Sequence, residues 1–425
     1  MAEPAATAAT TTVHAPSRPL RRCLVCGSQD LESFLDLGRT ALANRFLRAA
    51  SVHDPEPTYP LRVAFCHVCA HVQLTEAVQP DGMFRDYLYT SSGSDTLVAH
   101  LEGLSRLLVS RYALGPNDLV IDIGCNDGTL LNGFRRLGVR PLGIDPAENL
   151  ATFTQSSGIA RYADYFTSKT AARIVEEWGN ASVIVATNTF PHIQDVHDFV
   201  EGIRIALTPG GVFVIEAHYL ADLLDQTAFD TIYHEHVSYW ALGPMARLFG
   251  QHGMEIVDAQ RLTVHHGQLR TFVQRRGEGT ALSSVARILE EEQARGMDRI
   301  ETYRDFASRA LRIRDDVRST VHRLRAAGER VAAYGASAKG NTLLSFAELG
   351  PEAIEYVVDR SPLKQGLLTP GTHIPVVAPE RLRENSPGYL LLLAWNFVDE
   401  ILQQQEEFRR RQGRFIIPVP ALTIV

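Results

Sequence analysis

The 425-residue sequence predicts an α/β protein in three parts: a small zinc-binding N-terminal module, a central Rossmann-like domain and a C-terminal Rossmann-like α/β domain. Three observations predict this class. Four of the five cysteines form two C-x-x-C pairs, a strand, a glycine turn and a helix follow one another at two places, and a helical pattern separates those places. A chain of this length also exceeds the usual size of one hydrophobic core, so several domains are expected.

The composition describes a globular chain with an acidic balance. Apolar residues make up 45% and charged residues 21%, and 42 Lys and Arg stand against 49 Asp and Glu, a formal charge of −7. Binding to nucleic acid needs a clustered basic face, which this balance does not favour. The longest strongly apolar run, "YLLLLAW", is too short to cross a bilayer. We therefore expect a cytoplasmic monomer or homodimer that binds neither nucleic acid nor membranes.

The N-terminal residues predict a tail followed by a zinc-binding domain. Residues 1–20 are rich in Ala, Thr and Pro and are expected to form a disordered tail, not a signal peptide. In residues 21–80 the pairs "CLVC" and "CHVC" can surround zinc with four thiolates. The alternatives are disulfides, which would need a secretion signal, and a redox pair, which does not come doubled in one small segment. The predicted ligands of a structural zinc are Cys23, Cys26, Cys66 and Cys69.

Residues 81–275 predict a domain that binds a nucleoside cofactor. A buried strand, the turn "GCNDG" and a helix lead to a second strand that ends in Asp145, whose carboxylate can accept hydrogen bonds from ribose hydroxyls. The turn lacks the middle glycine that approaches a pyrophosphate, which favours S-adenosylmethionine. Ligands collect at the carboxyl ends of strands, and "TNTFPHI" follows a later strand. The predicted cofactor-binding residues are Asp122, Gly124, Asn126, Gly128, Asp145 and Asn188.

Two loops of this domain carry candidate side chains. "MFRDYLYTSSGSD" contains Tyr87 and Tyr89 among several hydroxyl residues, and it is either an ordinary loop or one that folds over a polar ligand. His192, at a strand end, is either a residue of the site or a solvated loop histidine.

After residue 275 the sequence predicts a helical connector over residues 276–330 and a second α/β domain over residues 331–425. "RVAAYGASAKG" repeats the strand, turn and helix, and here the turn carries Lys339. Backbone amides at a helix start together with an ammonium group suit a pyrophosphate; the alternative is a cofactor-free fold with a surface lysine. The predicted substrate-binding residues are Tyr87, Gly335, Ser337, Lys339 and Asn396.

The ordered motifs resemble those of the sugar C-methyltransferases. From about residue 21 to the end, the chain reads "CLVC", "CHVC", "YTSSGSD", "DIGCNDG", "NTFPHI", "YHEHVSYW", "HHGQLR" and "YGASAKG". The resemblance implies a zinc-binding domain, a central S-adenosylmethionine-dependent methyltransferase domain and a C-terminal domain that holds a nucleotide sugar, with dTDP as the nucleotide. It also implies methyl transfer to carbon 3 of a 4-keto-deoxysugar in an antibiotic pathway. His266 replaces a glycine that many relatives have, so the local loop and the choice of sugar stay open.

The stretch "DTIYHEHVSYW", residues 230–240, contains the groups that such a reaction needs. A carbon next to a ketone becomes nucleophilic after it loses a proton, which requires a base of near-neutral pKa and donors for the enolate oxygen. In this interpretation His236 is the base, Glu235 orients the imidazole or the sugar hydroxyls, and phenols and a second imidazole steady the ketone and close the site. The predicted catalytic residues are His236, Glu235, Tyr233, His192 and Tyr89.

Other interpretations of these motifs remain. The cluster can be a helix cap or a set of core side chains with satisfied hydrogen bonds, and for His234 and Tyr239 that is the favoured interpretation. A small-molecule O- or N-methyltransferase would share the cofactor fold but would have less use for a carbonyl-directed cluster. An RNA-modifying enzyme would need a basic face, and a non-catalytic scaffold would not need the cluster.

Overall fold

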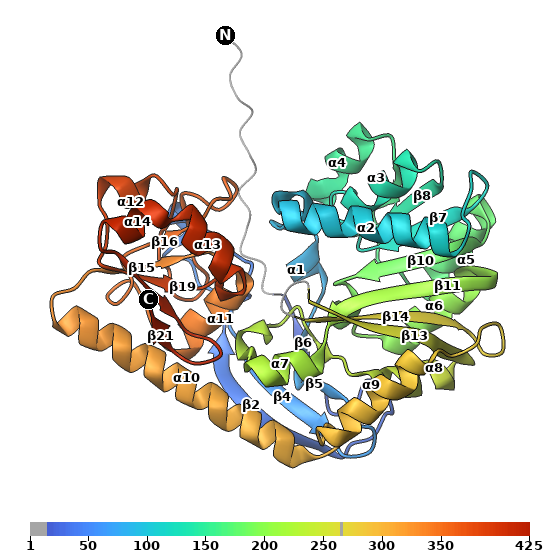
Figure 1. The fold of residues 1–425 in the computed structure, drawn as a ribbon, viewed down its shortest axis with the longest axis horizontal. Helices are drawn as coiled ribbons and strands as arrows, with labels where there is room; N and C mark the ends of the chain where they lie inside the picture. The colour runs from blue at the N-terminus through green and yellow to red at the C-terminus, as the bar shows by residue number, and fades with distance from the viewer. Residues whose placement is uncertain (1–14, 264–266) are drawn as a thin grey trace, which may run out of the picture.

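The computed structural model describes residues 15–263 and 267–425, and Figure 1 shows an N-terminal, a central and a C-terminal part. His266 lies outside the described residues, so the expectation about the "HHGQLR" loop has no structural counterpart here. Within the described ranges, no helix has the combination of length and apolar character that a membrane span requires.

The N-terminal part is built on a four-stranded antiparallel sheet in the order β12-β5-β4-β2. Its strands are β2 (Leu31–Thr40), β4 (Tyr59–Cys66), β5 (Val72–Leu74) and β12 (Ser238–Tyr239). The last of these belongs to the stretch that holds the predicted catalytic residues. The zinc module and the catalytic stretch therefore share one sheet, although they are far apart in the sequence.

The expected tail ends before residue 20. β1 (Ser17–Pro19) pairs antiparallel with β6 (Glu76–Val78), and the Tyr59 hydroxyl donates to the carbonyl of Ala15 at 2.9 Å. The boundary of the disordered tail at residue 20 is therefore wrong, because backbone hydrogen bonds to β6 stabilise a segment whose composition alone favours disorder.

The central part is a seven-stranded sheet in the order β13-β14-β11-β10-β7-β8-β9, in which β14 runs antiparallel to both of its neighbours and the other strands share one direction. The strands are β7 (Leu119–Ile123), β8 (Arg140–Ile144), β9 (Ala160–Tyr162), β10 (Ala181–Thr187), β11 (Leu207–His218), β13 (Met254–Leu262) and β14 (Gln268–Arg275). The helices are α2 (Asp95–Arg111), α3 (Thr129–Arg136), α4 (Ala151–Ser156), α5 (Ser168–Trp178), α6 (Val196–Ala206), α7 (Leu220–Gln226) and α8 (Leu242–Gln251).

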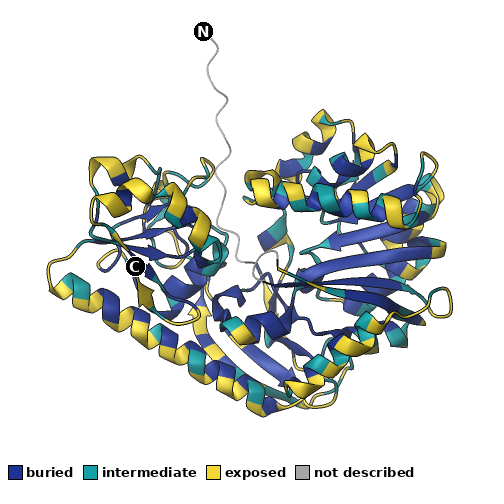
Figure 2. Cartoon of the chain, viewed as in Figure 1, coloured by how far each residue is buried: buried dark blue, intermediate teal, exposed yellow. Residues whose placement is uncertain are grey.

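Burial explains why this sheet forms. The five residues of β7, "LVIDI", are all buried, because helices cover both faces of the parallel strands. In Figure 2 the strands are dark blue, while the outer faces of the helices are mostly yellow. The carboxyl ends of β7, β8, β10 and β11 meet at one edge of the sheet, where ligands of such sheets bind.

The C-terminal part follows two connecting helices, α9 (Ser283–Ala294) and α10 (Ile300–Ala326). Figure 1 shows α10 running from the N-terminal sheet to the C-terminal part. Its buried side chains recur every three or four residues, as an amphipathic helix requires, and Tyr303 packs on Phe34 of β2 with 5.2 Å between ring centroids.

The C-terminal sheet has the order β18-β16-β15-β19-β20-β21. Its strands are β15 (Val331–Tyr334), β16 (Val357–Val358), β18 (Val376–Val377), β19 (Tyr389–Leu392), β20 (Arg414–Ile417) and β21 (Thr423–Ile424). Its helices are α11 (Ala338–Phe346), α12 (Arg381–Glu384), α13 (Val398–Gln404) and α14 (Glu406–Arg410). β17 (Leu367–Leu368) pairs with β3 (Leu47–Arg48), which ties this part to the zinc module.

Candidate active site

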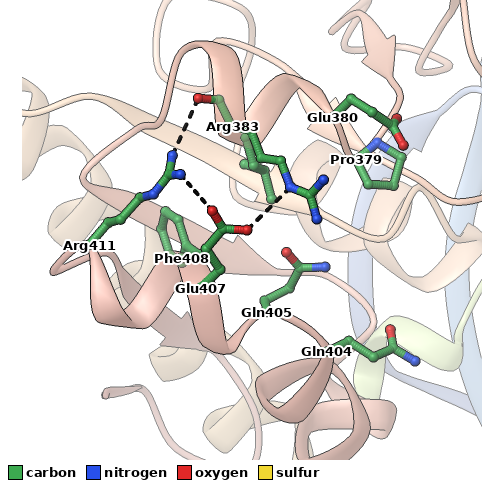
Figure 3. A pocket seen from close by; sticks show the side chains of 9 residues that line it. Pro379, Glu380, Arg383, Gln404, Gln405, Glu407, Phe408 and Arg411 are labelled. Atoms are coloured by element: carbon green, nitrogen blue, oxygen red, sulfur yellow. Dashed lines mark hydrogen bonds and ion pairs between the residues drawn. The ribbon is translucent and has the colours of Figure 1, made fainter.

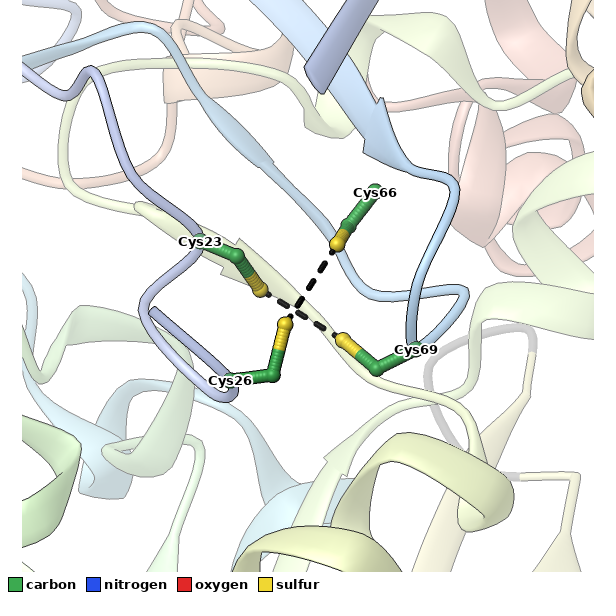
Figure 4. Close-up of side chains that lie close together, drawn as sticks. All are labelled: Cys23, Cys26, Cys66 and Cys69. Carbon is green, nitrogen blue, oxygen red and sulfur yellow. Dashed lines mark hydrogen bonds between the residues drawn. The ribbon is translucent and has the colours of Figure 1, made fainter. Parts of the chain in front are cut away.

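The four predicted zinc ligands meet in one cage, shown in Figure 4. The sulfur atoms lie within 4.8 Å of one another, with 3.4 Å between Cys23 and Cys69 and 3.6 Å between Cys26 and Cys66. Disulfide bonds are about 2 Å long, so the sulfurs are not bonded in pairs. Four sulfurs at about 2.3 Å from a tetrahedral zinc would be about 3.8 Å apart, and the cage fits that ion.

His236 is buried and oriented by two hydrogen bonds. Its Nδ1 donates to the carbonyl of Thr231 at 2.8 Å, so its Nε2 carries the lone pair and accepts from the Tyr233 hydroxyl at 2.9 Å. Burial holds the pKa of His236 well below 6.5, and the neighbouring His192 lowers that pKa further. The ring is therefore neutral at pH 7, with the tautomer that a base acting through Nε2 requires, but its pKa lies below the near-neutral value expected from the sequence, because burial disfavours the imidazolium.

Two more imidazoles surround this ring. His192, at the end of η4 (Phe190–His192), stacks on His236 with 5.2 Å between centroids, and on its other side it stacks on Phe84 of α1 (Asp81–Phe84) at 5.2 Å. Burial lowers the pKa of His192 to about 4. His218, the last residue of β11, lies 5.4 Å from His236 between centroids. Sequence reasoning missed His218, although its place at a strand end could have indicated it.

Glu235 binds different partners from those of His236. Asn44 of the zinc module donates through Nδ2 to Oε1 at 2.8 Å, and the Tyr87 hydroxyl donates to Oε2 at 3.1 Å. Burial raises the pKa of Glu235 to about 7, which these two hydrogen bonds oppose. The sequence allowed Glu235 to orient either the imidazole or a sugar hydroxyl; since the ring is held by Thr231 and Tyr233, the structure favours the second role. Asn44 was not predicted from the sequence as a residue of the site.

The neighbouring aromatic residues differ in their surroundings. His234 bonds the carbonyl of Pro60 at 3.3 Å through Nε2 and packs against Tyr59, which fits the structural interpretation, although its Nδ1 has no partner among the described residues. Tyr239 is buried in β12, but its hydroxyl has no hydrogen-bond partner among the described residues, so the satisfied hydrogen bond expected of it is missing. Tyr87 reaches the site through Glu235, whereas Tyr89 is 44% exposed.

The glycine turn after β7 has the backbone shape of a turn that lies close to a bound nucleoside. Gly124 has φ +75°, and a Cβ there would lie 2.1 Å from the Thr189 hydroxyl oxygen. Asp122 is buried, burial raises its pKa to about 8, and its Oδ1 has no hydrogen-bond partner among the described residues. An unpaired buried carboxyl oxygen at the end of β7 is the kind of position that a bound ligand completes, whereas the space beside Gly124 is filled by Thr189.

Asp145 and Asn188 stand at the ends of two strands. The carboxylate of Asp145 accepts from the backbone amides of Asn126 and Ala147, both at 2.8 Å, and its Oδ1 also accepts from Arg161 at 3.3 Å, which leaves a lone pair on Oδ2 for a ribose hydroxyl. Asn188 has φ +56°, and its Oδ1 accepts from Gln268 at 2.7 Å. Gln268, at the start of β14, was not predicted. These residues could hold S-adenosylmethionine.

The loop with Tyr89 is attached to this turn. Asn126 donates through Nδ2 to the carbonyl of Tyr89 at 3.0 Å and accepts from the amide of Ser91 at 2.9 Å. The amide of Ser92 donates to Asp127 at 2.8 Å. The loop therefore folds over the glycine turn, and whether it covers a polar ligand stays a prediction.

The C-terminal turn contributes Lys339 to the same region. Ser337 caps α11, its hydroxyl accepting from the amide of Gly340 at 3.1 Å, and Gly335 has φ +93°. Lys339 lies with its Nζ 5.4 Å from the centroid of the Trp395 ring. Asn396 follows Trp395 in η7 (Trp395–Phe397). A small cavity lies beside Lys339, with His218 as the imidazole that lines it; its lining residues are His218, Tyr219, Leu223, Ala228, Thr231, Gly267, Lys339 and Trp395.

A carboxylate accompanies Lys339. Asp230 of η5 (Phe229–Thr231) is buried and accepts from the Trp395 indole at 2.5 Å. Burial lowers the pKa of Lys339, and the charge of Asp230 opposes that shift.

A second hollow lies on the C-terminal part, away from the predicted residues (Figure 3). It is lined by α12, α13 and α14, and Glu407 bridges Arg383 and Arg411 across it. None of its lining residues was predicted for the site, and its main charges are paired with one another.

Comparisons with known proteins agree with this geometry. Three family models match: "Putative zinc binding domain" over residues 23–84, "Methyltransferase domain" over residues 98–259 and "C-methyltransferase C-terminal domain" over residues 263–420. The C-methyltransferase NovU of Streptomyces niveus is 37% identical over 409 residues, which are 96% of this chain and 97% of that one. The chain belongs to the C-methyltransferase family. This C-methyltransferase depends on S-adenosylmethionine, and the predicted fold class, enzyme class, cofactor and structural zinc are confirmed.

Other relatives match a smaller part of this C-methyltransferase. A ubiquinone biosynthesis O-methyltransferase of Methylobacterium sp. (strain 4-46) is 32% identical over 108 residues, 24% of this chain and 43% of the relative. Among solved structures, an S-adenosylmethionine-dependent methyltransferase from Anabaena variabilis is 16% identical with a TM-score of 0.35, over 42% of this chain and 85% of its own.

Proposed function

We propose that this C-methyltransferase methylates carbon 3 of a dTDP-linked 4-keto-deoxysugar through an enolate, as a step of antibiotic deoxysugar biosynthesis. The observation that carries the proposal is the buried neutral imidazole of His236, whose Nε2 lone pair faces the Tyr233 hydroxyl. Carbon methylation next to a ketone needs a base for a C–H proton, whereas O- and N-methylation act on an atom that already has a lone pair. The family match favours carbon as the methylated atom.

The first step of the proposed mechanism is proton transfer. Nε2 of His236 takes the proton of carbon 3, and the electrons of that C–H bond form the carbon–carbon double bond of the enolate. The 4-keto oxygen gains the negative charge and accepts hydrogen bonds from Tyr233 and His192. Tyr233 exchanges one partner for another in this step, because its hydroxyl leaves Nε2 and thereby frees the lone pair.

Other side chains hold the reactants. Glu235, with Tyr87 beside it, would accept from sugar hydroxyls, and Tyr89 would close the site from the loop above the glycine turn. S-adenosylmethionine, when bound, supplies an electrophilic methyl group. The residues predicted to bind it lie at the carboxyl edge of the central sheet: Asp122, Gly124, Asn126, Gly128, Asp145 and Asn188.

The nucleotide would lie on the C-terminal part. The turn before α11 contains Gly335 and Ser337, and the first turn of the helix contains Lys339. Backbone amides and an ammonium group at such a place suit a diphosphate, and Asn396 would contact the nucleotide. Lys339 and His218 line one small cavity, and His218 lies 5.4 Å from His236 between ring centroids, so the proposed diphosphate region is close to the imidazoles.

The proposal assigns one task to each part of the chain. Residues 21–80 bind zinc, residues 81–275 bind the cofactor and carry the base, and residues 331–425 bind the nucleotide sugar. Residues 276–330 connect the last two.

The test is methyl transfer to a panel of dTDP-linked sugars. The protein is incubated with methyl-labelled S-adenosylmethionine and dTDP-4-keto-deoxysugars, and the methylated atom is found by NMR. We expect a new carbon–carbon bond at carbon 3, and no transfer to the matched sugar whose ketone has been reduced, because that sugar cannot form an enolate. Methylation of an oxygen, or equal turnover of the reduced sugar, would contradict the proposal.

A further inference from the structure

The zinc module contributes a side chain to the candidate active site. Asn44 lies between β2 and β3, in "ALANRF", and its Nδ2 lies 2.8 Å from Oε1 of Glu235, a residue 191 positions later in the chain. No motif in the sequence indicated this contact.

The backbone around Asn44 is anchored on the C-terminal part. Residues 41–43 are buried, and the carbonyl of Ala43 accepts from the side chain of Asn341 at 2.7 Å. Asn341 belongs to α11, two residues after Lys339. Asn44 is thus held by the zinc module on one side and by the helix of the proposed diphosphate site on the other.

Both oxygens of Glu235 accept from a fixed donor. The Nδ2 group of Asn44 can only donate, so Oε1 is the acceptor in that contact. The Tyr87 hydroxyl donates to Oε2, and it is the one of the two donors that could turn and accept from a proton on Glu235. An acceptor oxygen with a fixed donor also favours the ionised carboxylate, because the donor stabilises negative charge.

We propose that Asn44 is a positioning residue that favours the ionised form of Glu235, with Oε1 held by the zinc module and Oε2 directed toward the hydroxyls of the sugar. This inference rests on the proposed function for the identity of the sugar. It gives the zinc module a part in the reaction besides its structural role.

Few other ionisable groups surround Glu235. Tyr87 and Tyr233 are phenols whose pKa burial raises well above 10, so both stay neutral across the pH range of the enzyme. Burial lowers the pKa of His236 and of His192, so neither becomes charged near pH 7. Among these five side chains Glu235 is the one that titrates near pH 7, and Asp122 of the cofactor edge, whose pKa burial raises to about 8, is told apart because Glu235→Gln leaves its titration in place.

The first measurement is the pH profile of kcat/KM for Asn44→Ala. We expect the acidic limb to move to higher pH by about one unit, so that the rate falls about tenfold on the acidic side and recovers at high pH. Glu235→Gln should lack this limb. Gln29→Ala, which removes an exposed amide in the same module, is the matched control and should keep the parent profile. Zinc content should be the same in all variants.

The second measurement needs no substrate. Infrared difference spectra of protein labelled with ¹³C-glutamate, with Glu235→Gln as the reference, follow the ionisation of Glu235 directly. We expect a higher midpoint in Asn44→Ala and a still higher one in Asn44→Asp, a variant of nearly the same shape that sets a second carboxylate against Oε1.

The two measurements separate this inference from the proposed function. If the parent protein methylates no 4-keto sugar, the proposed function fails while the infrared titration still tests Asn44. If either Asn44 variant titrates Glu235 at the parent midpoint, the inference is overturned, whatever the substrate proves to be.

Discussion

Replacing His236 tests the proposed base most directly. His236→Ala removes the Nε2 lone pair and the hydrogen bonds to Thr231 and Tyr233, but it leaves the glycine turn and the start of α11 unchanged. Because burial keeps the imidazole neutral at pH 7, the parent protein has its full base available, and the whole general-base contribution is lost in the variant. That contribution is about 10² to 10⁴ in rate, or about 3 to 5 kcal/mol of activation free energy.

The assay measures two rates and two affinities. Exchange of the carbon 3 proton with deuterated solvent, followed by NMR, should fall in parallel with methyl transfer, since enolisation precedes it. Calorimetry should show near-parent affinities for S-adenosylmethionine and for the nucleotide sugar. His236→Asn is a useful second variant, because its amide can still donate toward the carbonyl of Thr231 while it supplies no base.

The matched control is His234→Ala. This variant also removes a buried imidazole, one that bonds the carbonyl of Pro60, so it should lower stability yet keep proton exchange. Near-parent turnover in His236→Ala, combined with an inactive His192→Ala or Tyr89→Phe, would refute the assignment. The base would then lie at the end of β10 or in the loop above the glycine turn.

Three further predictions concern the metal, the cofactor and pH. The protein should hold about one zinc per chain by elemental analysis, and Cys23→Ser should lower the free energy of unfolding more than it alters chemistry; full stability without metal would contradict the cage. Asp145→Ala should weaken S-adenosylmethionine binding by about 1.5 to 3 kcal/mol in calorimetry, and unchanged affinity would mean that the ribose binds elsewhere. The folded-state pKa of Glu235 is raised to about 7, so the folded protein binds its proton more tightly than the unfolded chain and loses stability as pH rises from about 4.5 to 7. Glu235→Gln should remove that loss. Measured by denaturant unfolding, the free energy of unfolding of the variant minus that of the parent should be larger at pH 8 than at pH 4, by up to about 3 kcal/mol. If that difference is the same at both pH values, Glu235 does not titrate between them.

Local patterns in the sequence determined several features of this protein. The two C-x-x-C pairs predicted the zinc cage, because each pair sets two sulfurs on one tight turn whatever the rest of the fold does. The glycine turn and Asp145 predicted the cofactor edge, because a strand, a turn and a helix are specified by residues close in sequence. Three-part organisation followed from the same local periodicities.

Contacts between distant segments were decided only by the tertiary structure. Asn44 and Glu235 are brought together because β12, which follows Glu235 in the chain, pairs with β5 of the zinc module, and His218 at the end of β11 lies against His236 of a remote loop. The sequence likewise could not choose between Tyr87 and Tyr89, since both stand in one loop and only Tyr87 donates to Glu235. The physical reason is the same in each case: local periodicity specifies which face of an element is buried, while the partner of a polar side chain depends on which remote element covers that face.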